Sequence, residues 1–185
     1  MKKNIKVAAL LMALMLLVST AAFASSPSTE TITKPVTGYT DAGTTAGEGT
    51  AEDAKVAEKV LAEITVAATK TGGGGATGGA ALTYFTPTVR AQIAAIAPTV
   101  KTVAQVVPVK FGGTFSSGNF VWNFGNVALK VGMPVVVVAG VQEGGLIVWY
   151  PLSSSVVQVS YQTFVKFYIP KEIYVKGPTL LSILV

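Results

Sequence analysis

The side chains that most often carry catalysis are scarce in this chain of 185 residues, which contains no His and no Cys. The absence of His excludes a Ser-His-Asp hydrolase, an imidazole general base and a His-ligated metal. The absence of Cys excludes disulfides, thiol nucleophiles and Cys-zinc sites. The Ser-x-x-Lys and Gly-x-Ser-x-Gly patterns do not occur either. We therefore expect a protein that is not an enzyme and that uses no cofactor or metal.

Carboxylate pairs are the remaining test for hydrolytic chemistry, because glycosidases use two Asp or Glu side chains on either side of the scissile bond. Residues 98–185 contain only Glu143 and Glu172, and no Asp. Glu143 precedes Gly144-Gly145, and Glu172 follows Pro170-Lys171. Both positions are typical of solvated turns, so we expect neither residue to be catalytic.

A glycine-rich segment, residues 71–80, has a composition that could cradle a phosphate. Phosphate-binding loops also require a preceding strand and a following Gly-Lys-Ser/Thr, and both are missing here. We interpret residues 71–80 as a flexible linker.

Aromatic side chains are the better candidates for binding. Carbohydrate-binding domains present planar rings on one face of a sheet, and Trp122, Trp149 and Tyr150 could serve this purpose, as could Tyr161 and Tyr168. The alternative is that Phe120, Trp122 and Phe124 are alternating core residues and that Trp149 packs against them, because a small domain without disulfides needs its aromatic residues inside. The second interpretation is favoured. If Trp149 points inward, strand alternation turns Tyr150 outward.

The N-terminus has the three parts of a secretory signal peptide. Lys2, Lys3 and Lys6 precede an apolar run over residues 7–18, and cleavage is predicted between Ala24 and Ser25. The run is too short for a membrane span, which needs about 20 residues. We therefore expect a bacterial protein that is secreted or held at the cell surface, with no membrane span after cleavage. After residue 24 the net charge is only +2, and the seven cations of residues 81–185 are scattered singly, which argues against nucleic acid binding.

Two predicted regions precede the main domain. Residues 25–50 are rich in Ser, Thr and Gly, and we expect a disordered spacer. Residues 51–97 form a helical segment. Thr50 and Asp53 resemble a capping box for a first helix over 51–69, and Thr86-Pro87 opens a second helix.

Residues 98–185 are predicted to form the main domain. Fourteen of the sixteen aromatic residues lie within 84–185, and short apolar or alternating runs recur at regular spacing. The predicted class is α+β, mostly β: an antiparallel β-sandwich of about seven short strands with two N-terminal helices. Strands are expected over 103–111, 120–124 continuing to 127–131, 134–141, 146–152, 156–161, 164–169 and 172–176. Residues 180–185 are either the last strand or an exposed edge strand that pairs with another chain.

The apolar runs at 127–138, 144–151, 156–159 and 164–169 resemble the C-terminal β-sandwich module of exported proteins from Gram-positive bacteria, in which an Ala-rich helical segment often comes first. The similarity covers roughly residues 86–170. Ala139-Gly140 and the corner at residues 161–163 depart from its usual pattern. The resemblance implies a fold and a location, and no shared activity.

These observations lead to one main expectation and two alternatives. The main expectation is a non-enzymatic extracellular or cell-surface interaction module that binds an unknown protein or glycan, with oligomerisation through an edge strand as a possibility. The first alternative is a carbohydrate-binding domain that uses Tyr150 and a Trp. The second is an enzyme of unrecognised type.

Overall fold

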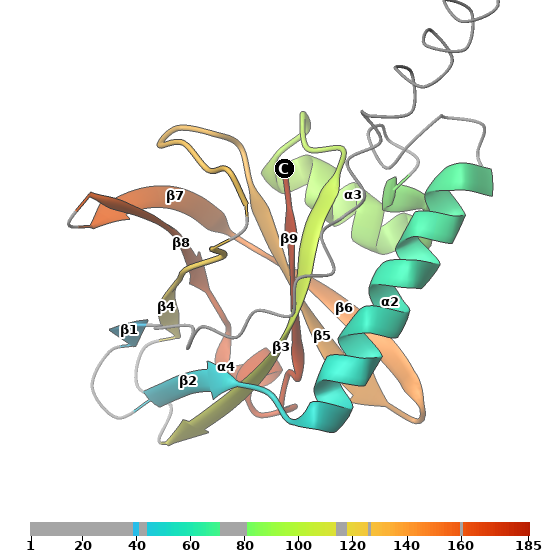
Figure 1. Ribbon diagram of the computed structural model, residues 1–185, viewed down its shortest axis with the longest axis horizontal. Helices are drawn as coiled ribbons and strands as arrows, with labels where there is room; N and C mark the ends of the chain where they lie inside the picture. The colour runs from blue at the N-terminus through green and yellow to red at the C-terminus, as the bar shows by residue number, and fades with distance from the viewer. Residues whose placement is uncertain (1–38, 41–43, 71–80, 114–117, 126, 160) are drawn as a thin grey trace, which may run out of the picture. The chain divides into compact units, whose positions relative to one another are not determined.

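The computed structural model describes residues 39–40, 44–70, 81–113, 118–125, 127–159 and 161–185 (Figure 1). The predicted signal peptide with its cleavage site at Ala24 and Ser25, the linker 71–80 and most of the spacer lie outside the described residues. The described part has the predicted α+β, mostly β class, with two antiparallel sheets. In that part, no helix has both the length and the apolar character needed to cross a membrane.

The helices lie where capping residues predict them. Helix α2 spans Ala51–Lys70, and Thr50 and Asp53 form the predicted capping box through bonds of 2.9 and 3.2 Å. Helix α3 spans Pro87–Ile96, and the Thr86 hydroxyl accepts from the Val89 amide. A 3-10 turn, η1 (Ala81–Tyr84), comes before α3, and a one-turn helix, α4 (Lys171–Tyr174), comes near the end of the chain.

Nine strands are described, in two sheets. The four-stranded sheet has the order β1-β4-β8-β7 and the five-stranded sheet has the order β2-β3-β9-β5-β6. The strands are β1 (Tyr39–Thr40), β2 (Thr44–Glu48), β3 (Val103–Gly113), β4 (Asn119–Trp122), β5 (Val136–Glu143), β6 (Leu146–Leu152), β7 (Ser154–Val159), β8 (Gln162–Tyr168) and β9 (Leu180–Leu184).

Two apolar clusters lie against the five-stranded sheet. One joins α2, η1 and α3 to one set of its side chains, among them Val106, Val138 and Trp149. The other contains side chains from both sheets, among them Val137 and Leu181 from the larger sheet and Phe120 and Val165 from the smaller one. The five-stranded sheet is therefore covered by helices on one face and shares its other cluster with the second sheet.

Strand β9 is central. It pairs antiparallel with β3 on one side and with β5 on the other, and all five of its residues are buried. The interpretation of 180–185 as the last strand is confirmed. The alternative of an exposed edge strand is wrong, because both edges of β9 are already paired (Figure 1).

Three local predictions need correction. Strands β1 and β2 lie within 25–50, which was predicted to be a disordered spacer, and β2 pairs with β3 from Thr44↔Gly113 to Glu48↔Val109. Residues 127–131 do not continue β4, because the Val127 amide turns back to the Phe124 carbonyl. Residues 172–176 are not a strand, because the Pro170 carbonyl accepts from both the Ile173 and Tyr174 amides and starts α4.

The predicted hairpin at Gly144-Gly145 is confirmed. Strands β5 and β6 pair from Val137↔Leu152 to Glu143↔Leu146, so the loop has two residues. Both glycines have positive φ angles, 58° and 82°, which is the backbone of a type I′ turn. This tight turn places the side chains at the end of β5 opposite those of β6.

Candidate functional site

The two Trp residues proposed for ligand binding are core residues. Trp122 is 0% exposed and belongs to the cluster shared by both sheets. Trp149 is 7% exposed, and its ring contacts those of Tyr84 and Phe85 edge-on, with centroids 6.3 and 5.6 Å away. The expectation that it packs against Trp122 and its neighbours is wrong, because Trp149 belongs to the cluster under the helices. Neither ring forms an exposed platform for stacking on a sugar.

Tyr150 points to the other side of β6 from Trp149, as strand alternation predicts. Its ring is partly exposed, and the Lys176 ammonium lies 5.1 Å from the ring centroid. Because the same ammonium donates to the Tyr150 hydroxyl at 2.7 Å, it lies at the hydroxyl end of the ring and not over the ring face. Of Trp122, Trp149 and Tyr150, only Tyr150 faces outward, and Lys176 already contacts it.

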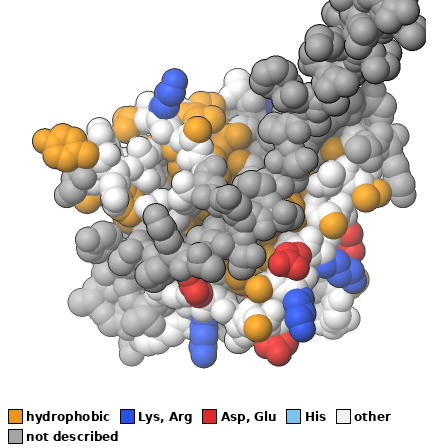
Figure 2. All heavy atoms as spheres, viewed as in Figure 1, with side chains coloured by type: hydrophobic (Ala, Val, Ile, Leu, Met, Phe, Trp, Pro, Cys, Tyr) orange, Lys and Arg blue, Asp and Glu red, His pale blue; other side chains and the backbone are white. Residues whose placement is uncertain are grey.

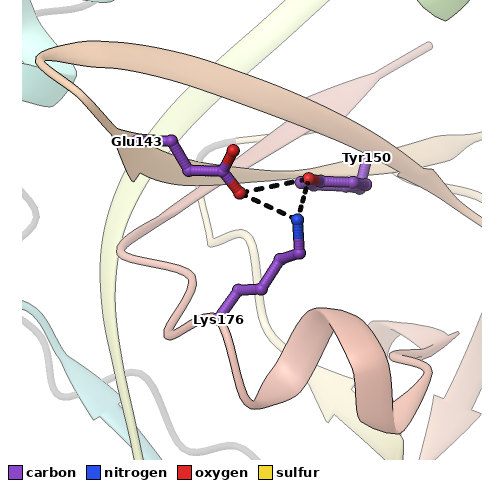
Figure 3. A network of polar contacts seen from close by, with 3 residues as sticks. All are labelled: Glu143, Tyr150 and Lys176. Carbon is purple, nitrogen blue, oxygen red and sulfur yellow. Dashed lines mark hydrogen bonds and ion pairs between the residues drawn. The ribbon is translucent and has the colours of Figure 1, made fainter.

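Glu143, Tyr150 and Lys176 form a polar network at the end of the β5–β6 hairpin (Figure 3). Lys176 donates to the Glu143 carboxylate at 2.9 Å and to the Tyr150 hydroxyl at 2.7 Å. Tyr150 donates to the same Glu143 oxygen at 3.3 Å. The sequence suggested Glu143 as a candidate acid and Tyr150 as a candidate binding ring, but it gave no reason to consider Lys176. Lys176 lies 33 positions after Glu143, and only the fold brings it next to the other two residues.

Electrostatics fix the charge states of this network. The hydrogen bond from Lys176 lowers the pKa of the Glu143 carboxyl below its ordinary value. Its bonds to Tyr150 and Glu143 raise the pKa of Lys176 to about 12. Both values move away from neutrality, so the acid stays ionised and the amine stays protonated. A general acid or an amine nucleophile needs the opposite shift, and this network acts instead as a tie between the hairpin and the segment after α4.

The other acid considered for hydrolysis, Glu172, lies exposed in α4. In the described residues, no group of three or more acidic side chains is placed to hold a metal ion. The carboxylates of this part of the chain thus form no cluster of the kind that holds a metal ion.

The described residues line at least two grooves on the surface. The larger, about 470 Å³, lies between the start of α2, the end of β3 and the segment after α4, and Asp53, Lys110, Phe111 and Tyr174 contribute to its lining. The smaller, about 340 Å³, lies between the end of α3, residues 132–135 and the start of β7.

The hairpin formed by β7 and β8 carries the most exposed aromatic ring among the described residues. Tyr161 follows β7 in its turn, is 97% exposed, and has a φ angle of 67°. Residues 154–165 contain no charged side chain. On the face shown in Figure 2, charged side chains gather over the part occupied by α2 and β2, whereas the end of the hairpin, at the left, shows a projecting hydrophobic side chain.

Sequence reasoning included Tyr161 among several possible rings and did not single it out. The signal that could have found it is local: a two-residue turn after a Val-rich strand ordinarily contains Gly or Asn, and here it contains Ser and Tyr. A bulky residue at positive φ is an outlier that often marks a functional position. Comparisons with family models, curated proteins and solved structures give no match to the chain.

Proposed function

We propose that this chain is an exported, non-enzymatic interaction module that binds a protein through the β7–β8 hairpin. The observation that carries the proposal is Tyr161, an almost fully exposed ring at a left-handed backbone position, at the tip of a hairpin whose residues 154–165 are uncharged. Tyr is a preferred anchor residue at protein interfaces, because it brings a large contact area and a polar tip at small entropic cost.

The charge states of the polar network support a non-enzymatic role. Lys176 and Glu143 hold each other in their charged forms across the neutral range. A site that transfers protons at neutral pH requires at least one group whose pKa lies close to that pH. The predicted signal peptide supports the extracellular or cell-surface location, in which a binding function needs no cofactor.

The burial of both Trp residues argues against a flat sugar-binding face. The Tyr150 hydroxyl is also bonded to Lys176 and Glu143, so a sugar that stacks on this ring would have to displace those bonds to reach the hydroxyl. We therefore favour a protein partner over a glycan.

Fluorescence and mass spectrometry of the protein purified after export test the proposal. The mass reports cleavage after Ala24. Because only Trp122 and Trp149 emit strongly, we expect blue-shifted emission that resists a soluble quencher and stays unchanged with cell-wall fragments and a glycan panel. Red-shifted emission that a glycan protects from quenching would contradict the proposal, and so would hydrolysis that Glu143→Gln abolishes.

The position of the binding surface needs its own test. Tyr161→Ser should weaken binding to protease-sensitive wall or supernatant components by about tenfold or more, the effect of losing an interface anchor. Tyr168→Ser is the matched control, because it also replaces one surface Tyr by Ser, and Tyr168 is 46% exposed on β8. Equal effects of the two changes would rule out Tyr161 as the anchor.

The larger groove supports a second candidate, a small glycan ligand. It combines the aromatic side chains of Phe111 and Tyr174 with the charged side chains of Asp53 and Lys110, a mixture typical of ligand pockets. The two candidates differ in the residues they need: Lys110→Ala should weaken glycan binding in the groove and leave binding through Tyr161 unchanged.

A further inference from the structure

Strand β7 lies at one edge of the four-stranded sheet and lacks the features that usually prevent an edge strand from pairing with another chain. In the described part of the chain it pairs only with β8, from Ser154↔Phe167 to Val159↔Gln162. Natural edge strands avoid pairing with other chains by carrying charges or Pro, by being very short or by being covered. β7 has six residues and carries neither a charge nor a Pro.

The other sheet ends carry such protection. Strand β6 contains Pro151 and contacts α3. Strand β1 has only two residues, and β2 contains the charged Glu48. β7 is therefore the sheet end at which a further strand can add with the least resistance.

A groove lies at the start of β7 and an exposed ring lies beyond its end. The start of β7, Ser154 to Val156, forms one wall of the smaller groove, whose other walls include Ile96, Pro98 and Met133. Tyr161 projects just beyond its other end. Antiparallel pairing of two identical strands places the end of each beside the start of the other. Such a pair would bring each Tyr161 to the groove of the opposite copy.

We propose that the partner of β7 is a second copy of this chain, paired antiparallel about a two-fold axis at Val157. This inference rests on the proposed function and names the partner of the same surface. In this register Val157 lies opposite itself and Ser155 lies opposite Val159. Tyr161 lies opposite Ser153, one residue from the groove wall that begins at Ser154. Each copy contributes the same surface, as a two-fold interface requires.

Two features favour a second copy over an extended segment of another protein. No like charges meet across the pair, because residues 154–165 are uncharged. A foreign strand would also use the edge of β7, but it would leave Tyr161 without the groove. In the two-fold pair, the Tyr161 ring of each copy meets the smaller groove of the other copy. That groove has a volume of about 340 Å³.

Cysteine cross-linking tests this register directly, because the chain contains no Cys. Directly opposite residues in an antiparallel pair have Cα atoms about 4.5–5.5 Å apart, within the range that a disulfide spans. Under mild oxidation, Val157→Cys should form a covalent dimer. Ser155→Cys and Val159→Cys should cross-link in a mixture of the two variants, and neither should do so alone.

Leu146→Cys is the matched control, because Leu146 is 74% exposed at the turn of a different hairpin. A Val157→Cys dimer that forms no faster than the Leu146→Cys dimer overturns the proposal. So does a protein that sediments as a monomer at every concentration. Tyr161→Ser should weaken dimerisation by about tenfold or more, and Tyr168→Ser should leave it unchanged.

Failure of this inference is distinguishable from failure of the proposed function. A monomer whose Tyr161 still governs binding to another protein contradicts the second copy and leaves the interaction module intact. Glycan-dependent protection of the Trp emission, or turnover that requires Glu143, contradicts the proposed function whether or not the chain forms dimers.

Discussion

Strands β9 and β7 are similar in composition and opposite in environment. Both are short, rich in aliphatic residues and uncharged. β9 has a strand on each side, and its side chains enter both apolar clusters. β7 has one strand beside it, and Val159 is 39% exposed at its end. Aliphatic composition thus indicates a strand, while the order of strands decides whether that strand builds the core or remains available for contact.

The largest expected effect comes from shortening a side chain of β9. Leu181 is fully buried in the cluster shared by both sheets. Leu181→Ala should lower the free energy of unfolding by about 2–5 kcal/mol, because the cavity adds to the lost burial. Val159→Ala at the end of β7 is the control and should change it by about 0.5 kcal/mol or less. Chemical denaturation measures both free energies of unfolding. Equal losses in the two variants would contradict the difference in burial between β9 and β7.

Glycine substitutions test how closely the neighbours of β9 pack. A Cβ added to Gly140 would lie 2.9 Å from the Trp149 ring and 3.1 Å from Leu180 Cβ. Gly140→Ala should therefore destabilise the protein by about 1–3 kcal/mol, the usual cost of overpacking. A Cβ at Gly47 on β2 meets no atom within 4 Å. Gly47→Ala should leave the melting temperature nearly unchanged, and a larger effect than at Gly140 would refute this account of the packing.

Two serines should respond with opposite signs. Ser182 in β9 is buried, and its hydroxyl has no hydrogen-bond partner within the described residues. Ser154 in β7 donates to the Leu152 carbonyl at 2.7 Å and accepts from the amide of buried Val137 at 2.9 Å. Ser182→Ala should stabilise the protein and Ser154→Ala should destabilise it, each by about 1 kcal/mol. A loss of stability with Ser182→Ala would indicate an unrecognised partner for its hydroxyl.

The smallest effect concerns the tie between Glu143 and Lys176. The lowered pKa of Glu143 contributes stability that is present above the ordinary carboxyl value of 4.5 and is lost as the pH falls through the folded-state value. The raised pKa of Lys176 contributes stability that is present below 10.5 and is lost as the pH rises through about 12.

Thermal melts of the wild type and Glu143→Gln should therefore differ at pH 7 and converge as the pH falls below 4.5. The difference should shrink in high salt, because the pair is exposed and open to screening. In a Lys176→Met background, the pH-dependent effect of Glu143→Gln should become much smaller, because only the hydrogen bond from Tyr150 to the carboxylate remains. A difference that persists at low pH would show that the carboxylate charge does not stabilise the fold.

Local chemistry made much of the fold predictable. The capping box at Thr50 and Asp53 marks the start of α2, and the Gly144-Gly145 pair marks the β5–β6 turn. Alternation correctly assigned Trp149 and Tyr150 to opposite sides of β6. The regular spacing of apolar runs correctly located β3 to β8, and residues 180–185 contain β9, but the predicted strand over 172–176 is wrong.

The remaining features depend on contacts between distant segments. β2 has little apolar surface, and its pairing with β3 gives no signal in its own composition. The central position of β9 depends on β3 and β5, which lie far from it along the chain. Ile173 and Tyr174 have a high propensity for strands. Their amides nevertheless donate to the Pro170 carbonyl in a short helical turn, and Gly177, with a positive φ angle, follows that turn. The network at Lys176 exists only because of that turn.

Hydrogen exchange of β9 and β7, measured in one sample at two protein concentrations, tests the central contrast most directly. We expect β9 amides to exchange only through global unfolding at both concentrations. We expect β7 amides to exchange much faster in dilute protein and to slow as the concentration rises, because a second copy then covers the edge. Protection of β7 that equals that of β9 in dilute protein, or β7 exchange that is independent of concentration, would contradict the account.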